Sequence, residues 1–357
     1  MRVSPPAAPG RASMYRLDAN KLGTCMLARL GAAGVAVESA NHVVASLIQT
    51  SLRGVDSHGI QLFPHYLRAV AAGRINATPV LRTEQTGASS ATLDAMDAFG
   101  HHAGAVAMDA AVQLAKASGI GAVSVGQSTH FGAAAYFALR AANDGCIGFS
   151  FTNADALVKA FNSSKPVFGT NPICFTAPLK TEGPLCLDMA TSLISWNKVR
   201  NCRATGSDLD EGWAFDKDGL PTRDANAAVS LSPAGGYKGY GLGMMVEVLC
   251  GLLADGPVAH ELLPMFTSPI EAKRKISHFF MAIDIGRFVA LDRFTERLQH
   301  LVDGIRSMPG TLAPVMVPGD PEKIAYAERT QSGIPVGQAL LDALVEADPY
   351  VLETVRQ

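Results

Sequence analysis

The string Thr129-His-Phe-Gly132 places an ionisable ring directly after a predicted buried strand. In α/β folds, ligands usually lie at the carboxyl ends of strands. Histidine is also the side chain best suited to exchange a proton near neutral pH. The string therefore predicts that His130 acts as a general acid or base. The alternative is that Thr129 caps a helix and that the histidine is structural.

A second string, Asp56-Ser-His-Gly59, follows the predicted end of a helix. Neighbouring side chains are expected to point in different directions, so the spacing alone does not indicate a nucleophile–base pair of Ser57 and His58. They could instead line one wall of a pocket, which Tyr66 would also reach if the segment between them is helical. The alternative is that Asp56 or Ser57 caps that helix and that His58 lies at the surface.

Two aspartates end predicted strands. Asp155 follows the strand that ends at Thr152, where it could orient a histidine, bind a polar group of a substrate, or occupy an ordinary turn. Asp188 ends the apolar run that begins at Leu185, where it could accept hydrogen bonds from a ribose or cap the helix that follows. Between them, the string Gly169-Thr-Asn-Pro172 has the composition of a turn.

Lys238 lies at the start of a long apolar helix and is preceded by two glycines. A cation is unfavourable there, because the N-terminus of a helix already carries partial positive charge. The arrangement makes sense if an anion, such as a phosphate or carboxylate, binds between the lysine and the free backbone N–H groups. The alternative is a surface lysine whose small penalty, up to about 1 kcal/mol, is tolerated.

Several well-known signatures are absent from the sequence. No strand is followed by GxGxxG and a helix, so the fingerprint of a Rossmann fold is missing. The sequence also contains no Walker A loop, HExxH or GxSxG. A metal-dependent hydrolase that uses His101, His102 or His130 stays open as a different class, although these residues form no paired ligand motif.

Composition excludes other classes of function. The 32 acidic and 30 basic residues give a net charge of −2, which argues against a nucleic-acid partner or an anionic membrane. No apolar run approaches the roughly 18 residues that a membrane span needs. The six cysteines form no CxxC pair and lie mostly in apolar runs, which predicts free thiols in a reducing, cytoplasmic compartment.

Helices alternate with short strands, so the fold class is mixed α/β. Hydrophobic periodicity predicts helices at 18–32, 38–52, 103–117, 133–143, 193–203 and 237–253. It predicts strands near Val80 and Ala91 and at 120–125, 146–152, 173–177, 185–187 and 279–283. A turn is expected at 216–219, and the tail from 291 is expected to be helical, with an interruption at 309–320. Residues 1–14 are expected to be a flexible leader. Residues 15–75 and 290–357 are expected to form one helical lobe, and 76–289 a central β-rich domain that binds cofactor and substrate.

The chain resembles the malate/L-lactate dehydrogenase family that is distinct from the Rossmann lactate dehydrogenases. That family also includes ureidoglycolate and sulfolactate dehydrogenases, diketogulonate reductase and piperideine-carboxylate reductase. The strings that carry the resemblance appear in family order: Ser57-His-Gly59, His130-Phe-Gly132, Thr152-Asn153, Gly169-Thr-Asn-Pro172, Asp188-Met-Ala-Thr-Ser192, Trp196-Asn-Lys-Val199, Lys238-Gly-Tyr-Gly-Leu242, His278-Phe-Phe280 and Val317-Pro-Gly319. Their spacing is most similar to the ureidoglycolate dehydrogenase branch.

The resemblance implies a family-specific, non-Rossmann fold that binds NAD or NADP, and a homodimer with its pocket near the subunit boundary. It implies that His130 is the proton acceptor. The substrate and nicotinamide pocket would be lined by Ser57, His58, Tyr66 and Asp155, and the cofactor would be contacted by Ala154, Asn171, Asp188, Met189, Ala190, Lys238, Gly319 and Asp320. The resemblance also places Lys198 at a catalytic position, where the imine reductase branch carries an aspartate.

The resemblance therefore predicts hydride transfer between a nicotinamide cofactor and a small 2-hydroxy acid or 2-keto acid of the malate, lactate or ureidoglycolate type. Many family members carry an arginine five residues after the Ser57 position, whereas this chain has Leu62 there. A dicarboxylate then lacks its usual bidentate partner, for which Arg53, His65 or Arg68 could substitute. The alternative is an NADPH-dependent reductase of a cyclic imine or diketo sugar acid, against which Lys198 argues. A nucleotide-binding scaffold without catalysis is the non-enzymatic alternative.

Overall fold

The computed structural model describes residues 15–345, and its centre is a mixed sheet. Within this range the sheet has seven strands: β2 (Arg82–Gly87), β3 (Ser90–Asp94), β4 (Ile120–Ser128), β13 (Ile276–Asp284), β5 (Cys146–Thr152), β8 (Ile173–Ala177) and β9 (Leu185–Met189), in that spatial order. Only β3 and β4 pair in parallel; the other neighbours are antiparallel. The mixed α/β class is confirmed. The strand expected near Val80 is wrong, because Val80 is exposed and β2 begins at Arg82.

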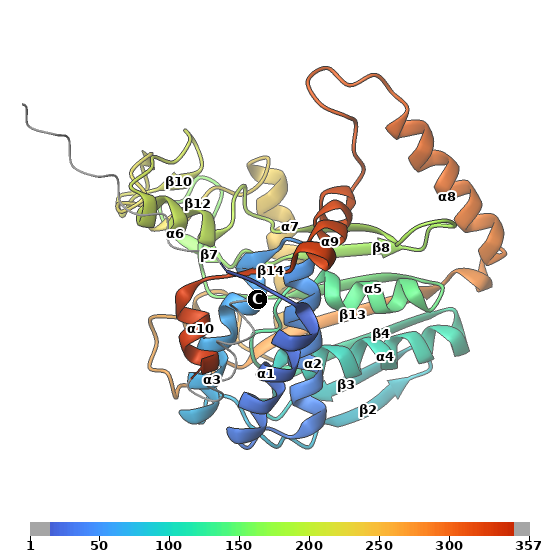
Figure 1. Cartoon of the computed structure of the whole chain (residues 1–357), viewed down its shortest axis with the longest axis horizontal. Helices are drawn as coiled ribbons and strands as arrows, with labels where there is room; N and C mark the ends of the chain where they lie inside the picture. The colour runs from blue at the N-terminus through green and yellow to red at the C-terminus, as the bar shows by residue number, and fades with distance from the viewer. Residues whose placement is uncertain (1–14, 346–357) are drawn as a thin grey trace, which may run out of the picture.

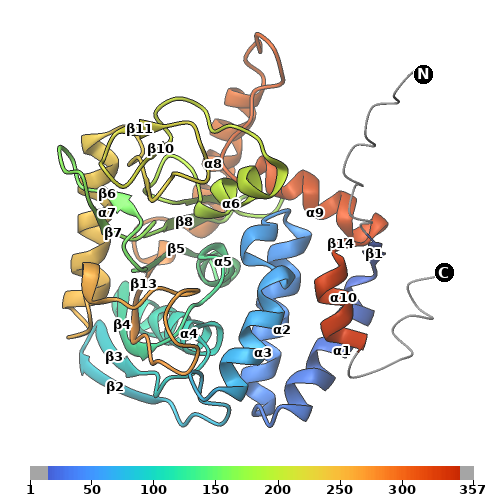
Figure 2. The same cartoon turned by 90° about the vertical axis from the view of Figure 1, so that its left-hand side faces the viewer.

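Helices cover both faces of this sheet (Figure 2). One face packs against α4 (Gly100–Ser118) and α5 (Ala135–Asn143), whose many alanines let the helices approach the strands closely. The other face packs against α7 (Tyr237–Glu247) and the π-helical turn η3 (Val248–Leu252). The sequence predicts one α-helix through Leu253. The structure differs because the amide of Leu253 donates to Val248 O, five residues back, where Gly251 packs closely against Val258.

The two ends of the described chain meet beside α4 and α5 (Figure 1). This layer contains β1 (Tyr15–Leu17), α1 (Ala19–Ala32), α2 (Val37–Leu52), α3 (Phe63–Ala71), β14 (Ile334–Val336) and α10 (Gln338–Val345). The carboxylate of Asp18 accepts from the amides of Asn20 and Lys21 and so caps α1, the helix predicted over 18–32. β1 pairs with β14, and residues from both ends share one apolar core. Three-residue strands carry too little periodicity to be predicted.

One helix assigned to the helical lobe lies elsewhere. α8 (Leu291–Arg306) packs its Val302 against Leu179 and Val317, beside the hairpin of β8 and β9, and shares no apolar cluster with α1, α2 or α3 in the described chain. The lobe expected over 290–357 is therefore split at α8, because the apolar partners of this helix lie on the hairpin. The predicted leader, 1–14, and the last residues of the predicted lobe, 346–357, lie outside the described residues.

A smaller sheet carries the wall opposite the helical layer. Within the described range its spatial order is β11 (Pro221–Thr222), β10 (Ala214–Phe215), β12 (Ser230–Leu231), β6 (Val158–Lys159) and β7 (Pro166–Phe168). The predicted turn at 216–219 joins β10 to β11, as expected. Ser195 is the N-cap of α6 (Trp196–Thr205), and its hydroxyl accepts from the amide of Lys198.

Candidate active site

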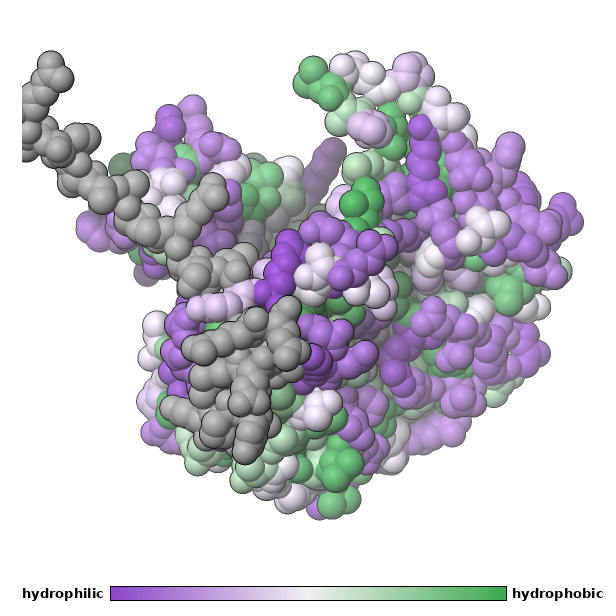
Figure 3. Space-filling model, in the orientation of Figure 1, coloured by the Kyte–Doolittle hydropathy of each residue, from purple (hydrophilic) through white to green (hydrophobic). Residues whose placement is uncertain are grey.

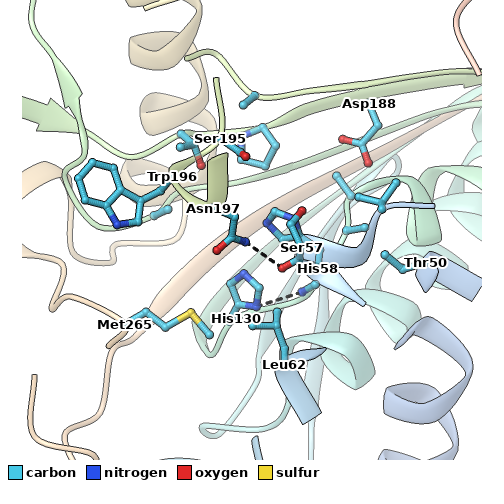
Figure 4. A pocket seen from close by; sticks show the side chains of 18 of the residues that line it. Thr50, Ser57, His58, Leu62, His130, Asp188, Ser195, Trp196, Asn197 and Met265 are labelled. Atoms are coloured by element: carbon cyan, nitrogen blue, oxygen red, sulfur yellow. Dashed lines mark hydrogen bonds between the residues drawn. The ribbon is translucent and has the colours of Figure 1, made fainter. Parts of the chain in front are cut away.

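A cavity of about 530 Å³ lies at the edge of the central sheet where β4, β5 and β9 end. Strand pairing brings these ends together: Ser128 pairs with Ile276, Thr152 with His278, and Ile173 with Met189. The remaining walls come from the end of α2, the short helical turn η1 (Asp56–His58), the start of α6 and the loop 264–267 (Figure 4). Antiparallel β13 lets strands distant in sequence end at one edge.

His130 lines this cavity at the end of β4. The hydroxyl of Thr129 accepts from the amide of Gly100, so the expected cap belongs to α4 rather than to the following helix. Gly132 has φ +78°, and a side chain there would meet His101, which favours glycine at this turn. On the ring, Nδ1 lies 2.7 Å from the hydroxyl of Tyr66 and 3.3 Å from the amide of Gly132. These contacts fix the ring and leave Nε2 without a partner in residues 15–345.

The surroundings of His130 favour its neutral form. Burial lowers the pKa of His130 well below its usual value, and the positive charges that His58, His101 and Arg274 carry or can gain lower it further. An amide N–H can only donate, so Nδ1 accepts and the neutral ring carries its proton on Nε2. If Tyr66 accepts from Nδ1 instead, the proton moves off Nε2. The second tautomer requires rotation of the Tyr66 hydroxyl, and the Gly132 amide then loses Nδ1 as its acceptor.

Tyr66 was expected to bind substrate, but it lies behind His130 rather than in the cavity lining. Its side chain is only 1% exposed and packs edge-on against His101. Burial raises the pKa of the Tyr66 phenol above its usual value, so the hydroxyl stays protonated. The structure thus makes Tyr66 a positioning residue for His130.

The variant Tyr66→Phe is expected to shift the acid limb of the kcat/KM profile to higher pH. In the tautomer of the free enzyme that carries its proton on Nε2, the hydroxyl donates to Nδ1 and stabilises the neutral ring, so its loss raises the pKa of His130. We expect kcat to fall roughly threefold to tenfold, the value of about one hydrogen bond. The pH dependence of both parameters is the measurement. A lower kcat with an unmoved acid limb would mean that Tyr66 only supports packing.

Ser57 and His58 lie in the turn η1 and line the cavity. Contrary to expectation, their side chains meet, because the tight turn brings the Ser57 hydroxyl within 2.9 Å of Nδ1 of His58. The rings of His58 and His130 stack with centroids 5.8 Å apart. Burial lowers the pKa of His58. The side chain of Asn197 donates to Ser57 O at 3.1 Å, which joins this turn to α6 across the cavity (Figure 4).

The same turn is held by the C-terminal part of the chain. Arg329, on α9 (Asp320–Ser332), makes a bidentate ion pair with Asp56, with N–O distances of 2.5 and 2.9 Å. It also donates to Ser51 O at the end of α2. The alternative that Asp56 caps the next helix with its side chain is therefore wrong. Instead, its pairing fixes the wall that carries Ser57 and His58.

Asp155 lines the cavity but does not bond to His130. Its carboxylate accepts from Arg274 at 2.5 Å and from the amide of Met265 at 3.4 Å. Arg274 is 4% exposed and also donates from Nε to Leu263 O. Its Nη1 makes no hydrogen bond within the described chain, and the residue lines the cavity. The pair therefore places a fixed positive charge at the end of the cavity that contains His130.

Asp188 lies at the other end of the cavity. Its Oδ2 accepts from the amide of Ala135 at 2.8 Å, so it caps α5 rather than a helix that follows it. Burial raises the pKa of Asp188 to about 6, although the Ala135 amide and the charge of Arg53 oppose this. Arg53 lines the same end, and its guanidinium makes no hydrogen bond or ion pair in the described chain.

Ala154 and Ala190 line the cavity as predicted, whereas Asn171 lies behind its wall. The Asn171 side chain accepts from the Ala154 amide and donates to Gly243 O and to the buried carboxylate of Glu247. Both polar atoms of the Asn171 side chain, Oδ1 and Nδ2, are therefore engaged by the protein itself. Asn171 therefore positions the backbone of Ala154.

Five other predicted residues are not among the described residues that line the cavity: Met189, Lys198, Lys238, Gly319 and Asp320. Asp320 is paired with Arg306, and this contact lowers the pKa of its carboxyl group. Lys198 is exposed and lies over the ring of Trp213. Lys238 lies at the start of α7, after two glycines with positive φ, where the sequence placed it. It is exposed, as in the alternative of a surface lysine. The roles assigned to these five stay predictions.

Residues that the sequence reasoning did not single out also line the cavity. Met265, Phe266 and Arg274 lie on or beside an irregular loop with no motif, so no sequence signal marks them. Asn197 lies in a string that carries the resemblance, yet only its contact with Ser57 reveals its role. Of the proposed substitutes for the missing arginine, Arg53 lines the cavity, whereas His65 and Arg68 do not.

The hydrolase alternative required a shared metal site at His101, His102 or His130. In residues 15–345 these three histidines do not form one metal site. Only His102 belongs to a group with metal-ligand spacing, and its partners there are neither His101 nor His130. Both ring nitrogens of His101 are buried without a partner. No helix in the described range has the length and apolar character needed to cross a membrane.

Comparisons with known proteins agree with this geometry. The family model described as malate/L-lactate dehydrogenase matches residues 17–345. Malate dehydrogenase of Pyrococcus abyssi is 34% identical, covering 93% of each chain. Ureidoglycolate dehydrogenase (NAD(+)) of Escherichia coli K12 is 32% identical, covering 95% of each. The two identities differ too little to favour one branch.

The fold is similar to that of a solved relative. The crystal structure of malate dehydrogenase from Entamoeba histolytica superposes with a TM-score of 0.89 and 28% identity, covering 95% of this chain and 98% of that one. The match thus extends over both sheets and the helical layer. With a family match over nearly the whole described range, the chain belongs to the malate/L-lactate dehydrogenase family.

Proposed function

We propose that this protein is an NAD(P)-dependent oxidoreductase that interconverts a small 2-hydroxy acid and its 2-keto acid. The observation that carries the proposal is the arrangement of one cavity. A neutral imidazole and a fixed cation lie at one end. At the other end lie the guanidinium of Arg53, which has no partner in residues 15–345, and the carboxylate of Asp188. The first end suits an alcohol next to a carboxylate, and the second suits a dinucleotide.

The residues of the second end fit a nicotinamide dinucleotide. Arg53 is free to pair with a phosphate, and Oδ1 of Asp188 has no partner in the described chain and can accept from a ribose hydroxyl. Ala154 and Ala190 offer apolar wall between the two ends. When bound, the cofactor supplies the ring that accepts or returns the hydride. The role predicted for Lys238 as a phosphate ligand would add to that of Arg53.

We expect cofactor binding to weaken in acid because of Asp188. Its pKa of about 6 means that the group is ionised above this value and protonated below it. The dissociation constant of the cofactor should rise roughly tenfold between about pH 8 and about pH 5, since one charge-assisted hydrogen bond is lost. Fluorescence titration of the binary complex measures it. In Asp188→Asn the dependence should disappear; an unchanged dependence would remove Asp188 from the site.

His130 carries the proton transfer. In oxidation, Nε2 accepts the hydroxyl proton of the substrate while Nδ1–H donates to Tyr66. In reduction, protonated Nε2 donates to the keto oxygen. Arg274 holds the substrate carboxylate through Nη1, while Asp155 and Leu263 O keep the guanidinium in place.

The substrate end also has an apolar wall, beside Ser57, His58 and Asn197. Leu62, Met265, Phe266 and Trp196 line it. Among cations, only Arg274 lines this end in the described chain. One carboxylate is therefore satisfied and a second would be left without a partner, at the cost of desolvating a charge. We infer a 2-hydroxy monocarboxylate with an apolar or uncharged side chain rather than a dicarboxylate such as malate.

Leu62→Arg should change this preference. A guanidinium at this position would offer a bidentate partner to a second carboxylate. We expect kcat/KM for malate to rise about 10-fold to 100-fold relative to that for lactate. Steady-state kinetics on both acids is the measurement, with Leu62→Met as the control for packing. If the ratio of kcat/KM for malate to that for lactate is the same in both variants, the side chain of the substrate does not lie next to residue 62.

The central experiment is a nicotinamide absorbance assay. Purified protein is mixed with NAD or NADP and a panel of 2-hydroxy acids, or with the reduced cofactors and 2-keto acids, a cyclic imine and a diketo sugar acid. We expect turnover of a 2-hydroxy monocarboxylate that survives treatment with a chelator. Turnover of the imine alone would support the reductase alternative, and absence of turnover with every pair would contradict the proposal.

We further propose that the protein is a cytoplasmic homodimer. The five buried cysteines, Cys146, Cys174, Cys186, Cys202 and Cys250, form no disulfide in the described chain, which supports a reducing compartment. Exposed apolar residues on α7 and η3 support a partner surface: Met244, Met245, Val248, Leu252 and Leu253. A second group, which includes Leu312, occupies the projecting loop between α8 and α9, visible at the top of Figure 3. Sedimentation equilibrium measures the assembly.

A further inference from the structure

A group of potential metal ligands lies outside the cavity, between α2 and α4. Glu38 and His42 occupy positions i and i+4 of α2, which places them on one face of that helix. His102, the third residue of α4, faces them. One ligand atom of each residue lies within 4.8 Å of the others. Neither the proposed reaction nor the resemblance uses these three residues.

His102 is already arranged as a metal ligand would be. Its side chain is 6% exposed, and its Nδ1 lies 2.8 Å from the hydroxyl of Ser39. If Nδ1–H donates to that hydroxyl, the lone pair is on Nε2, which is the tautomer a metal requires. Nε2 lies 3.5 Å from Oε1 of Glu38. Two ligands about 2.1 Å from a tetrahedral ion are separated by about 3.4 Å, so this spacing needs little adjustment.

His42 completes the group. Its ring stacks on that of His102 with centroids 5.3 Å apart, and its ring nitrogens make no hydrogen bond in the described chain. Burial and the neighbouring imidazole lower the pKa of His42, and burial lowers that of His102, so both rings are neutral near pH 7. Nearby Asp109 is bound by Arg140 at 2.6 Å and is not available as a ligand.

We propose that Glu38, His42 and His102 bind one divalent transition-metal ion of the zinc class, which joins α2 to α4. Two imidazoles and one carboxylate suit Zn²⁺, whereas Ca²⁺ and Mg²⁺ require mostly oxygen ligands. Three protein ligands leave one position for water, and the 71% exposed side chain of Glu38 gives the ion access from solvent. The opposite end of α2 lines the cavity through Thr50, so the ion would hold a helix that forms the cofactor end.

The test is isothermal titration of chelator-treated protein with zinc chloride alone. We expect one ion per chain, bound at least about tenfold more weakly by Glu38→Gln and by His42→Gln, since each loses a ligand. Circular dichroism checks folding; Glu38 is exposed, so its variant should fold normally. In thermal unfolding, zinc should raise the midpoint of the unaltered chain and not that of either variant. Cobalt should give visible absorption bands typical of tetrahedral coordination in the unaltered chain alone.

Matched controls separate other zinc-binding groups. His300→Gln, on exposed α8, should bind zinc like the unaltered chain. Cys25→Ser removes the one cysteine that is not buried, and should also leave binding unchanged. His58→Gln reports on binding by the imidazoles of the cavity. The proposal is overturned if no stoichiometric zinc binds, if Glu38→Gln and His42→Gln bind it like the unaltered chain, or if binding is lost in His58→Gln or Cys25→Ser instead.

Discussion

His130→Ala should lower kcat by roughly 10²–10⁴-fold while leaving the dissociation constant of the cofactor nearly unchanged. The loss corresponds to about 3–5 kcal/mol of barrier. The physical reason is that His130 lines the cavity with an Nε2 that has no partner among residues 15–345, while Tyr66 and Gly132 hold its Nδ1. The substitution removes both the proton acceptor for the alcohol and the proton donor for the ketone, so the rates of oxidation and of reduction should fall together.

The measurement pairs single-turnover kinetics with cofactor titration. His300→Ala, an exposed residue on α8, is the matched control and should behave like the unaltered enzyme. The assignment of His130 fails if the variant retains full turnover. A variant that loses cofactor binding to the same extent as turnover would instead indicate that the ring supports the cavity wall.

Asp155→Asn should destabilise the protein by about 3–5 kcal/mol, because it leaves a buried guanidinium without its counter-charge. The side chain of Arg274 is 3% exposed and that of Asp155 is 17% exposed, with the charged atoms 2.5 Å apart. The amide keeps the shape but removes the negative charge. We also expect KM for the hydroxy acid to change, since the freed guanidinium loses its fixed direction.

The measurement is urea unfolding followed by circular dichroism. A solvent-exposed pair provides the control: Arg16 and Glu328 lie 3.2 Å apart with side chains 46% and 60% exposed. Glu328→Gln should cost less than about 1 kcal/mol, because water screens such a pair. If the two variants are equally stable, Arg274 is solvated in solution and cannot act as the fixed carboxylate ligand.

Patterns within one element were predicted well. Strands β5 and β8 have the predicted bounds, and Asp18 caps α1. These features depend on contacts between residues close in sequence, so the chain itself encodes them. Short paired segments such as β1 and β14 were missed, because their stability comes from a partner more than 300 residues away.

Several roles depend on which partner a polar group finds. Asp188 was expected either to accept from a ribose or to cap the following helix; it caps α5, which precedes it, so the second alternative is wrong. Asp155 was expected to orient a histidine, to bind a polar group of the substrate or to occupy an ordinary turn, and the structure pairs it with Arg274. Tyr66 was expected to contact substrate, yet it bonds to His130 from behind. In each case the partner lies on a distant segment, which a local sequence pattern does not reveal.

The sequence by itself determined the mixed α/β class, the family and the strings that end at the cavity, because strand periodicity and turn residues act locally. Only the tertiary structure decided that Arg274, on an unpatterned loop, lines the same cavity as His130 and that Arg329 of α9 holds the turn of Ser57 and His58. It also decided that Arg53 has no partner among the described residues. Charge pairing and burial depend on how non-neighbouring segments pack. No local pattern can specify which carboxylate a given arginine meets, so that choice appears only in the folded chain.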